Sequence, residues 1–171
     1  MCLLVRKISR AKWESAAKGA EISADAITGC LRTSDNNLSV WRIEDDSAVE
    51  DAILAIVSNS QHPDTIYVAL LHEREVLASG FQLDAKLGAT PVERLRDTHC
   101  DICGLTYGSL GLIAGLIVNS IQQNEVKRFN RKSILDLLKN AIDAGDVQME
   151  ELQERMKLEL KKTFPGAQSQ S

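Results

Sequence analysis

The sequence predicts an α+β fold, with α/β as the alternative: a small mixed sheet with packed helices in the first half, and a helical second half. Three observations support this class. Strand-like apolar runs occur before residue 88, helical apolar spacing lies between two of them, and only helical spacing follows that point. With 171 residues, 44% hydrophobic and 26% charged, the chain is globular and long enough to bury a large core.

The first elements are a strand over residues 3–8, a short helix or turn over 13–18, and a helix over 23–32. The last of these begins with a serine that can cap it, and an acid lies in its first turn, where the helix dipole favours negative charge. Residues 38–43 alternate and are rich in β-branched and aromatic side chains, which predicts the next strand.

A strong helix is predicted over 47–58, where apolar residues recur at helical spacing and Ser47 with Glu50 can form a capping box. The continuous apolar run 66–71 predicts a buried strand. Together with the strand over 38–43, this order is typical of a βαβ unit, with a right-handed crossover if its two strands lie parallel.

Residues 75–83 are expected to return as a hairpin strand. Helices are then predicted over 92–99, 109–122, 133–144 and 147–162, with a glycine ending the third of them.

The change of character near residue 88 predicts three parts of the chain. Residues 1–88 form a mixed α/β part, and residues 89–163 form a helical part that is either a second domain or continuous with the first. Residues 164–171 are expected to be a disordered polar tail.

The charge balance restricts the class of partner. The chain has 20 lysines and arginines against 24 aspartates and glutamates, a net charge of −4. An acidic balance disfavours a general nucleic-acid or anionic-membrane binder, because phosphate binding depends on clustered cations. Aromatic residues make up only 4%, which argues against a stacking platform for single strands.

The predicted location is the cytoplasm. Four cysteines are too few for a disulfide framework, and free thiols are the default in a reducing compartment. Arg6, Lys7, Arg10 and Lys12 follow the first apolar stretch, whereas basic residues precede the apolar run of a secretory signal. Residues 102–124 carry no charge, but glycines and polar residues interrupt them, so a buried helix is expected and a membrane partner is not.

The sharpest local motif is the pair Cys100-x-x-Cys103, preceded by His99 and followed by a glycine. Two cysteines at this spacing can bind one tetrahedral zinc ion, with His99 as a candidate further ligand. The same spacing serves thiol–disulfide exchange. In the alternative, no cofactor is bound, and the two cysteines are small apolar side chains packed at a helix–helix junction.

An acidic cluster at 44–51 holds five acids in eight positions, Glu44, Asp45 and Asp46 among them. These three residues are candidates for binding a basic partner, and the cluster is also a candidate Mg²⁺ site. The alternative is that they lie at a helix N-terminus, where the helix dipole stabilises acids.

A basic group, Lys127, Arg128, Arg131 and Lys132, precedes the penultimate helix with Phe129 between its members. The protein-binding surface is assigned first to Arg128, Phe129, Arg131 and Lys132 of this group. Two helices follow this group and faintly resemble a helix-turn-helix, but acids open the last helix and would repel DNA phosphates, so direct sequence-specific reading is not expected. A basic patch that meets an acidic protein is the better fit.

The sequence lacks a nucleophile elbow, a phosphate loop and a dinucleotide fingerprint, so no catalytic residue is assigned. It favours a small non-catalytic accessory subunit, adaptor or inhibitor that binds another protein within a larger cytoplasmic complex, with homo-oligomerisation as an option. The alternatives are a zinc-binding or thiol-redox protein built on the cysteine pair, a nucleic-acid-associated regulator, and an enzyme whose site is assembled from scattered residues.

Overall fold

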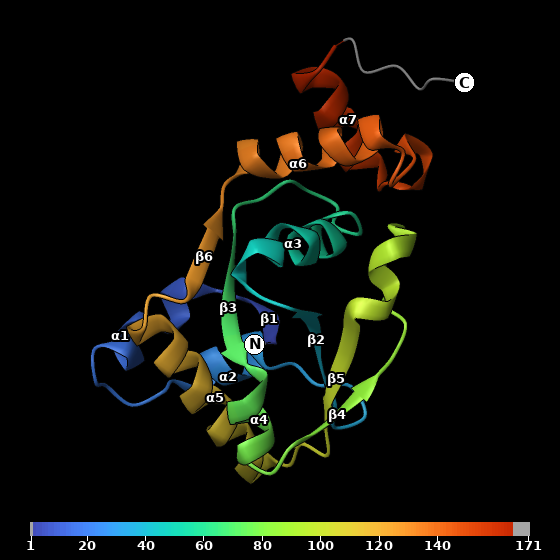
Figure 1. The fold of residues 1–171 in the computed structure, drawn as a ribbon. Coiled ribbons are helices and arrows are strands. Elements are labelled where there is room, and N and C mark those ends of the chain that lie inside the picture. The colour runs from blue at the N-terminus through green and yellow to red at the C-terminus, as the bar shows by residue number, and fades with distance from the viewer. Residues whose placement is uncertain (1, 166–171) are drawn as a thin grey trace.

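The computed structural model describes residues 2–165, which form one six-stranded sheet with helices on both faces (Figure 1). The strand order is β4-β5-β2-β1-β3-β6, and every neighbouring pair is antiparallel. The α+β class is therefore confirmed, whereas the sheet is antiparallel throughout and not mixed.

The strands are β1 (Leu3–Ile8), β2 (Leu38–Ile43), β3 (Ile66–His72), β4 (Gln82–Ala85), β5 (His99–Cys103) and β6 (Val126–Phe129). The α-helices are α1 (Glu14–Ala17), α2 (Ala24–Cys30), α3 (Val49–Val57), α4 (Glu73–Ala78), α5 (Tyr107–Gln122), α6 (Arg131–Ala144) and α7 (Glu154–Thr163). Short 3-10 helices are η1 (Arg10–Lys12), η2 (Asp46–Ala48), η3 (Glu93–Thr98) and η4 (Met149–Glu151).

Each face of the sheet has its own apolar core. One face, called the α3 face, packs against α3, α6 and α7, and its cluster includes Val5, Ile53 and Leu138. The other face, called the α5 face, packs against α1, α2, α4 and α5, and its cluster includes Leu4 and Trp13. The sheet is therefore the middle layer of three.

The predicted βαβ unit is present in an altered form. Strands β2 and β3 run in the same direction and α3 connects them, but β1 lies between them and pairs with both in antiparallel fashion. The continuous apolar run of β3 misled the prediction, because such runs are typical of parallel strands buried on both faces. Here helices cover both faces of an antiparallel sheet, which buries β3 equally well.

Helix caps follow the predicted chemistry with one change. Ser23 caps α2 by accepting a hydrogen bond from the Ala26 N–H at 3.2 Å, as predicted. The predicted Ser47–Glu50 capping box is replaced by a cap two residues earlier, where the Asp45 carboxylate accepts a hydrogen bond from the Ser47 N–H at 2.8 Å. The chain enters through η2 and α3 begins only at Val49, which moves the capping position back to Asp45.

The predicted hairpin strand over 75–83 is largely wrong. Residues Glu73–Ala78 form α4, and only Gln82–Ala85 are extended, as β4. Glu73 and Glu75 lie in the first turn of α4, and the segment consists of good helix formers with only one β-branched residue. Local helix propensity therefore accounts for the helix in place of the expected strand.

The second half is mainly helical but also contributes two strands, β5 and β6, which corrects the expectation of helices alone. Helices α5 and α6 confirm the predicted segments, and Gly145 ends α6 with a left-handed φ of +80°. The helix expected over 147–162 is divided into η4 and α7, and the one expected over 92–99 is the 3-10 helix η3.

The polar tail was expected to begin at residue 164, but Phe164 packs against the α3-face cluster and donates its N–H to the Leu160 carbonyl. Residues 166–171 of the predicted tail lie outside the described residues. Within residues 2–165, no helix has the length and apolar character needed to cross a membrane.

Candidate functional site

The predicted basic surface lies on and beside β6, which is an edge strand of the sheet. Arg128 is exposed on β6, Lys132 is exposed in the first turn of α6, and Phe129 is half-buried against the α3-face cluster. Arg131 forms an ion pair with Glu159 of α7, so its charge is already compensated within the chain. Only Arg128 and Lys132 of the predicted group therefore present charge to a partner.

The outer edge of β6 has main-chain groups without a neighbouring strand. The Leu70 N–H donates to the Glu125 carbonyl at 3.2 Å, just before β6 begins. In an antiparallel ladder, alternate residues turn their N–H and C=O toward the same neighbour. The N–H and C=O of Val126 and Arg128 consequently point away from β3, toward the side where the described sheet ends.

The predicted acidic cluster serves mainly structural roles. Asp45 caps η2, and its hydrogen bonds from Ser47 lower the pKa of its carboxyl group. Asp46 forms a 2.6 Å ion pair with Lys127 of β6, which joins the acidic cluster to the basic one. Glu44 is exposed. The two clusters, expected to be separate binding surfaces, are neighbours that partly neutralise each other.

Strand geometry separates the predicted metal ligands. His99, Cys100 and Cys103 all belong to β5, whose successive side chains point to opposite faces. Cys100 lies in the α5-face cluster, whereas Cys103 is three residues further and therefore points to the α3 face with His99. This geometry does not bring the two thiols to one ion, and it does not favour a disulfide between them. Among residues 2–165, no group of three histidine, cysteine or acidic side chains is placed to hold a metal ion.

We expect Cys100 to behave as a buried, neutral thiol. Burial raises the pKa of Cys100 to about 11, from an ordinary value of 9.0. The unfolded thiol ionises first as pH rises, so this contribution to stability is complete below pH 9 and is lost between pH 9 and about 11. Over that interval, the free energy of unfolding measured in urea should fall more steeply with pH for the wild type than for Cys100→Ala. Parallel pH profiles of the two proteins would show that the thiol is not held neutral.

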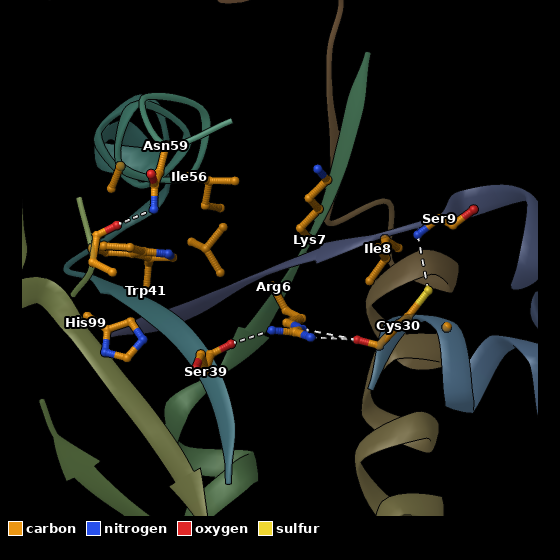
Figure 2. Close-up of a pocket in the computed structure, with 14 residues that line it drawn as sticks. Arg6, Lys7, Ile8, Ser9, Cys30, Ser39, Trp41, Ile56, Asn59 and His99 are labelled. Carbon is orange, nitrogen blue, oxygen red and sulfur yellow. Dashed lines mark hydrogen bonds between the residues drawn. The ribbon is translucent and has the colours of Figure 1, made fainter. Parts of the chain in front are cut away.

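A groove of about 500 Å³ opens where β1 and β2 separate (Figure 2). The last β1–β2 pair is Val5 with Trp41; beyond it, β1 continues beside β3, and the start of β2 continues beside β5. The groove, called the Arg6 groove, is lined by Val5, Arg6, Lys7, Ile8, Ser9, Gly29, Cys30, Ser39, Trp41, Ala55, Ile56, Asn59, Ala89 and His99.

Arg6 occupies the gap between the two strands. Its Nε and Nη2 donate to the Cys30 carbonyl at 3.2 and 2.8 Å, and its Nη1 donates to the Ser39 carbonyl at 2.7 Å (Figure 2). Burial, which penalises the charged form, lowers the pKa of this guanidinium, although an arginine remains cationic at neutral pH. Its partners among residues 2–165 are carbonyl oxygens and not a carboxylate.

Aromatic side chains form one wall of the groove. Trp41 and His99 pack edge to face, with ring centroids 5.1 Å apart. A Cβ at Gly88 would clash with the Trp41 ring and lie 2.9 Å from the His99 Cβ, so only glycine lets the indole take this position. Asn59, which follows the end of α3, donates a hydrogen bond to the Ala89 carbonyl at 3.0 Å (Figure 2). This bond links the end of α3 to the loop at the rim of the groove.

Sequence reasoning grouped Arg6 with the other N-terminal basic residues and did not identify the groove. The available pattern was the charged pair Arg6 and Lys7 between Val5 and Ile8 of an otherwise apolar strand, in which alternation turns one of the two charges toward each face. An ionised side chain in such a strand is unusual, because buried charge is costly unless it is hydrogen-bonded. Its partners, Cys30 and Ser39, are 24 and 33 residues away in sequence, so the site appears only in the folded chain.

Comparisons with known proteins identify no relative. No family model matches the chain, and neither the curated proteins nor the solved structures contain a significant match.

Proposed function

We propose that the protein is a non-catalytic accessory subunit, an adaptor or inhibitor, that binds another protein within a larger complex. The observation that carries this proposal is the open basic edge of β6, where outward main-chain groups of Val126 and Arg128 lie beside the uncompensated charges of Arg128 and Lys132. A strand with a free edge can accept a further strand from a partner, and the main-chain hydrogen bonds then supply affinity.

The charges at this edge specify the chemistry of the partner. Arg128 lies on β6 itself and Lys132 lies just beyond its end, so an incoming strand would pass both. Lysine and arginine at an edge discourage pairing between identical copies, because like charges would face each other. An extended acidic segment of a different protein relieves that repulsion and gains charge complementarity.

Charge reversal at this edge should remove the partner. Tagged wild-type protein, expressed at native level in its own host and captured at physiological salt, should retain a stoichiometric protein that mass spectrometry identifies. The double variant Arg128→Glu/Lys132→Glu should retain about tenfold less of it, because two attractive contacts become repulsive. Any complex that this variant still forms should depend less on salt concentration.

The control is Arg32→Glu/Arg74→Glu, which makes the same change in net charge at two other exposed arginines. It should capture the partner as the wild type does. Arg128→Pro adds a test of strand addition, because proline removes an N–H that points away from β3 and so spares the existing ladder. Equal capture by all these variants, or a partner without an extended acidic segment, would contradict the proposal.

A further inference from the structure

We propose that the Arg6 groove binds a small organic acid, a monocarboxylate with a flat apolar or aromatic body. This site is distinct from the basic edge of β6: its lining comes from β1, β2, β5, α2, α3 and the loop before η3. The inference therefore stands or falls separately from the proposed function.

The spare hydrogen-bonding capacity of Arg6 indicates the anion. A guanidinium has five N–H donors, and Arg6 uses three of them in hydrogen bonds to the carbonyls of Cys30 and Ser39. Two N–H groups are left, and they belong to a cation that no carboxylate compensates among residues 2–165. The planar fork of arginine matches the two oxygens of a carboxylate.

The charges around the groove favour an anion over a neutral ligand. Lys7 is exposed at the rim, and Lys12 lies against Gly29 of the lining. The buried acid Asp101 accepts a hydrogen bond from the Ser39 hydroxyl at 3.0 Å and lies 3.9 Å from Nε2 of His99 in the lining. Lys86 pairs with Asp101 at 3.0 Å, so this carboxylate adds no uncompensated negative charge beside the groove.

The remaining lining indicates the body of the ligand. Ile56 supplies an apolar contact and Trp41 a flat aromatic surface, and both lie on the α3-face side of the gap, where Val5 is fully buried. Arg6 and Ile8 lie on the α5-face side, so a ligand that contacts both Arg6 and Trp41 extends through the gap between β1 and β2. A volume of about 500 Å³ is within the range of small-molecule pockets. Phosphate is a poorer fit, because phosphate sites use several free main-chain N–H groups, whereas the Ser9 N–H here already bonds the Cys30 Sγ at 3.3 Å.

Three probes with the same ring test the charge requirement on the unmodified protein: benzoate, benzamide and phenyl phosphate. Saturation-transfer NMR should detect benzoate at millimolar concentration, and competition should show benzamide binding at least tenfold more weakly. In a Trp13→Phe variant, Trp41 is the single remaining tryptophan, and benzoate should change its fluorescence with the same affinity.

Two variants test whether benzoate binds in the groove. Ala89→Trp, at an exposed rim position, should abolish benzoate binding without touching Arg6. Arg6→Gln should weaken benzoate at least tenfold and leave benzamide unchanged. If Arg6→Gln fails to fold, the benzoate–benzamide comparison and Ala89→Trp still decide the question.

Four results would overturn the proposal: no benzoate binding at about 10 mM, equal binding of benzamide, undiminished binding to Ala89→Trp, or tighter binding of phenyl phosphate than of benzoate. If benzoate does not bind, the role of Arg6 is structural: it donates hydrogen bonds to the carbonyls of Cys30 and Ser39 and binds no ligand.

Discussion

Replacing Leu138 by alanine should destabilise the whole chain by about 2–5 kcal/mol and leave a single unfolding transition. Leu138 is fully buried, and it lies in the same cluster as residues of α3 and of the sheet. Loss of its side chain removes apolar contacts and leaves a cavity that the neighbouring helices can close only in part. The cluster contains residues from both halves of the chain, so we expect a cavity beside α6 to destabilise the sheet as well.

Urea unfolding followed by two spectroscopic signals measures this coupling. Far-UV circular dichroism reports all helices, whereas tryptophan fluorescence reports only Trp13 and Trp41, which lie before residue 88. Both midpoints should fall together in Leu138→Ala. Asn140→Ala, at an exposed position of the same helix, should leave both within about 0.5 kcal/mol of the wild type.

A fluorescence midpoint that stays at the wild-type value would contradict this expectation. It would mean that residues 89–163 unfold as a domain of their own, the alternative that the sequence left open. The two strands from the second half argue for one unit, because β5 pairs with β2 and β6 pairs with β3.

The long amphipathic segments could be predicted from sequence, since their positions depend on periodicity that is visible locally. Helices α3, α5 and α6 each bury apolar residues at helical spacing, which a single chain displays without knowledge of its partners. The strands β5 and β6 have only five and four residues. β6 carries two charges, as edge strands do, whereas β5 lies between β4 and β2 and contains His99 and Asp101. Such short polar patterns are also typical of loops.

The candidate site was less accessible to sequence reasoning than the fold. Asp46 and Lys127 pair across 81 positions, so their mutual neutralisation depends on how β6 is placed beside β3. The motif Cys100-x-x-Cys103 was interpreted as one site because its spacing suits a tight turn, whereas a strand at the same spacing turns the two thiols apart. Which interpretation holds depends on the sheet neighbours of β5, which local sequence does not reveal.

Replacing Trp13 by alanine should have the largest effect of any single change in the α5-face core, about 3–5 kcal/mol. Trp13 is fully buried and is the largest side chain in that cluster, between η1 and α1. It packs in the same cluster as Ile113 and Ile117 of α5. Its removal therefore weakens the attachment of the segment after β1 to the helix that covers the sheet.

The matched control is Trp13→Phe, which keeps an aromatic ring in the same place. The indole Nε1 of Trp13 is buried and has no hydrogen-bond partner among the described residues. A buried donor without an acceptor costs about 1–3 kcal/mol, so phenylalanine loses contact area but removes that cost. The free energy of unfolding of Trp13→Phe, measured in urea, should lie within about 1.5 kcal/mol of the wild-type value and well above that of Trp13→Ala. If both variants lost equal stability, the indole N–H would have an acceptor in solution, and the unpaired state of Trp13 would be wrong.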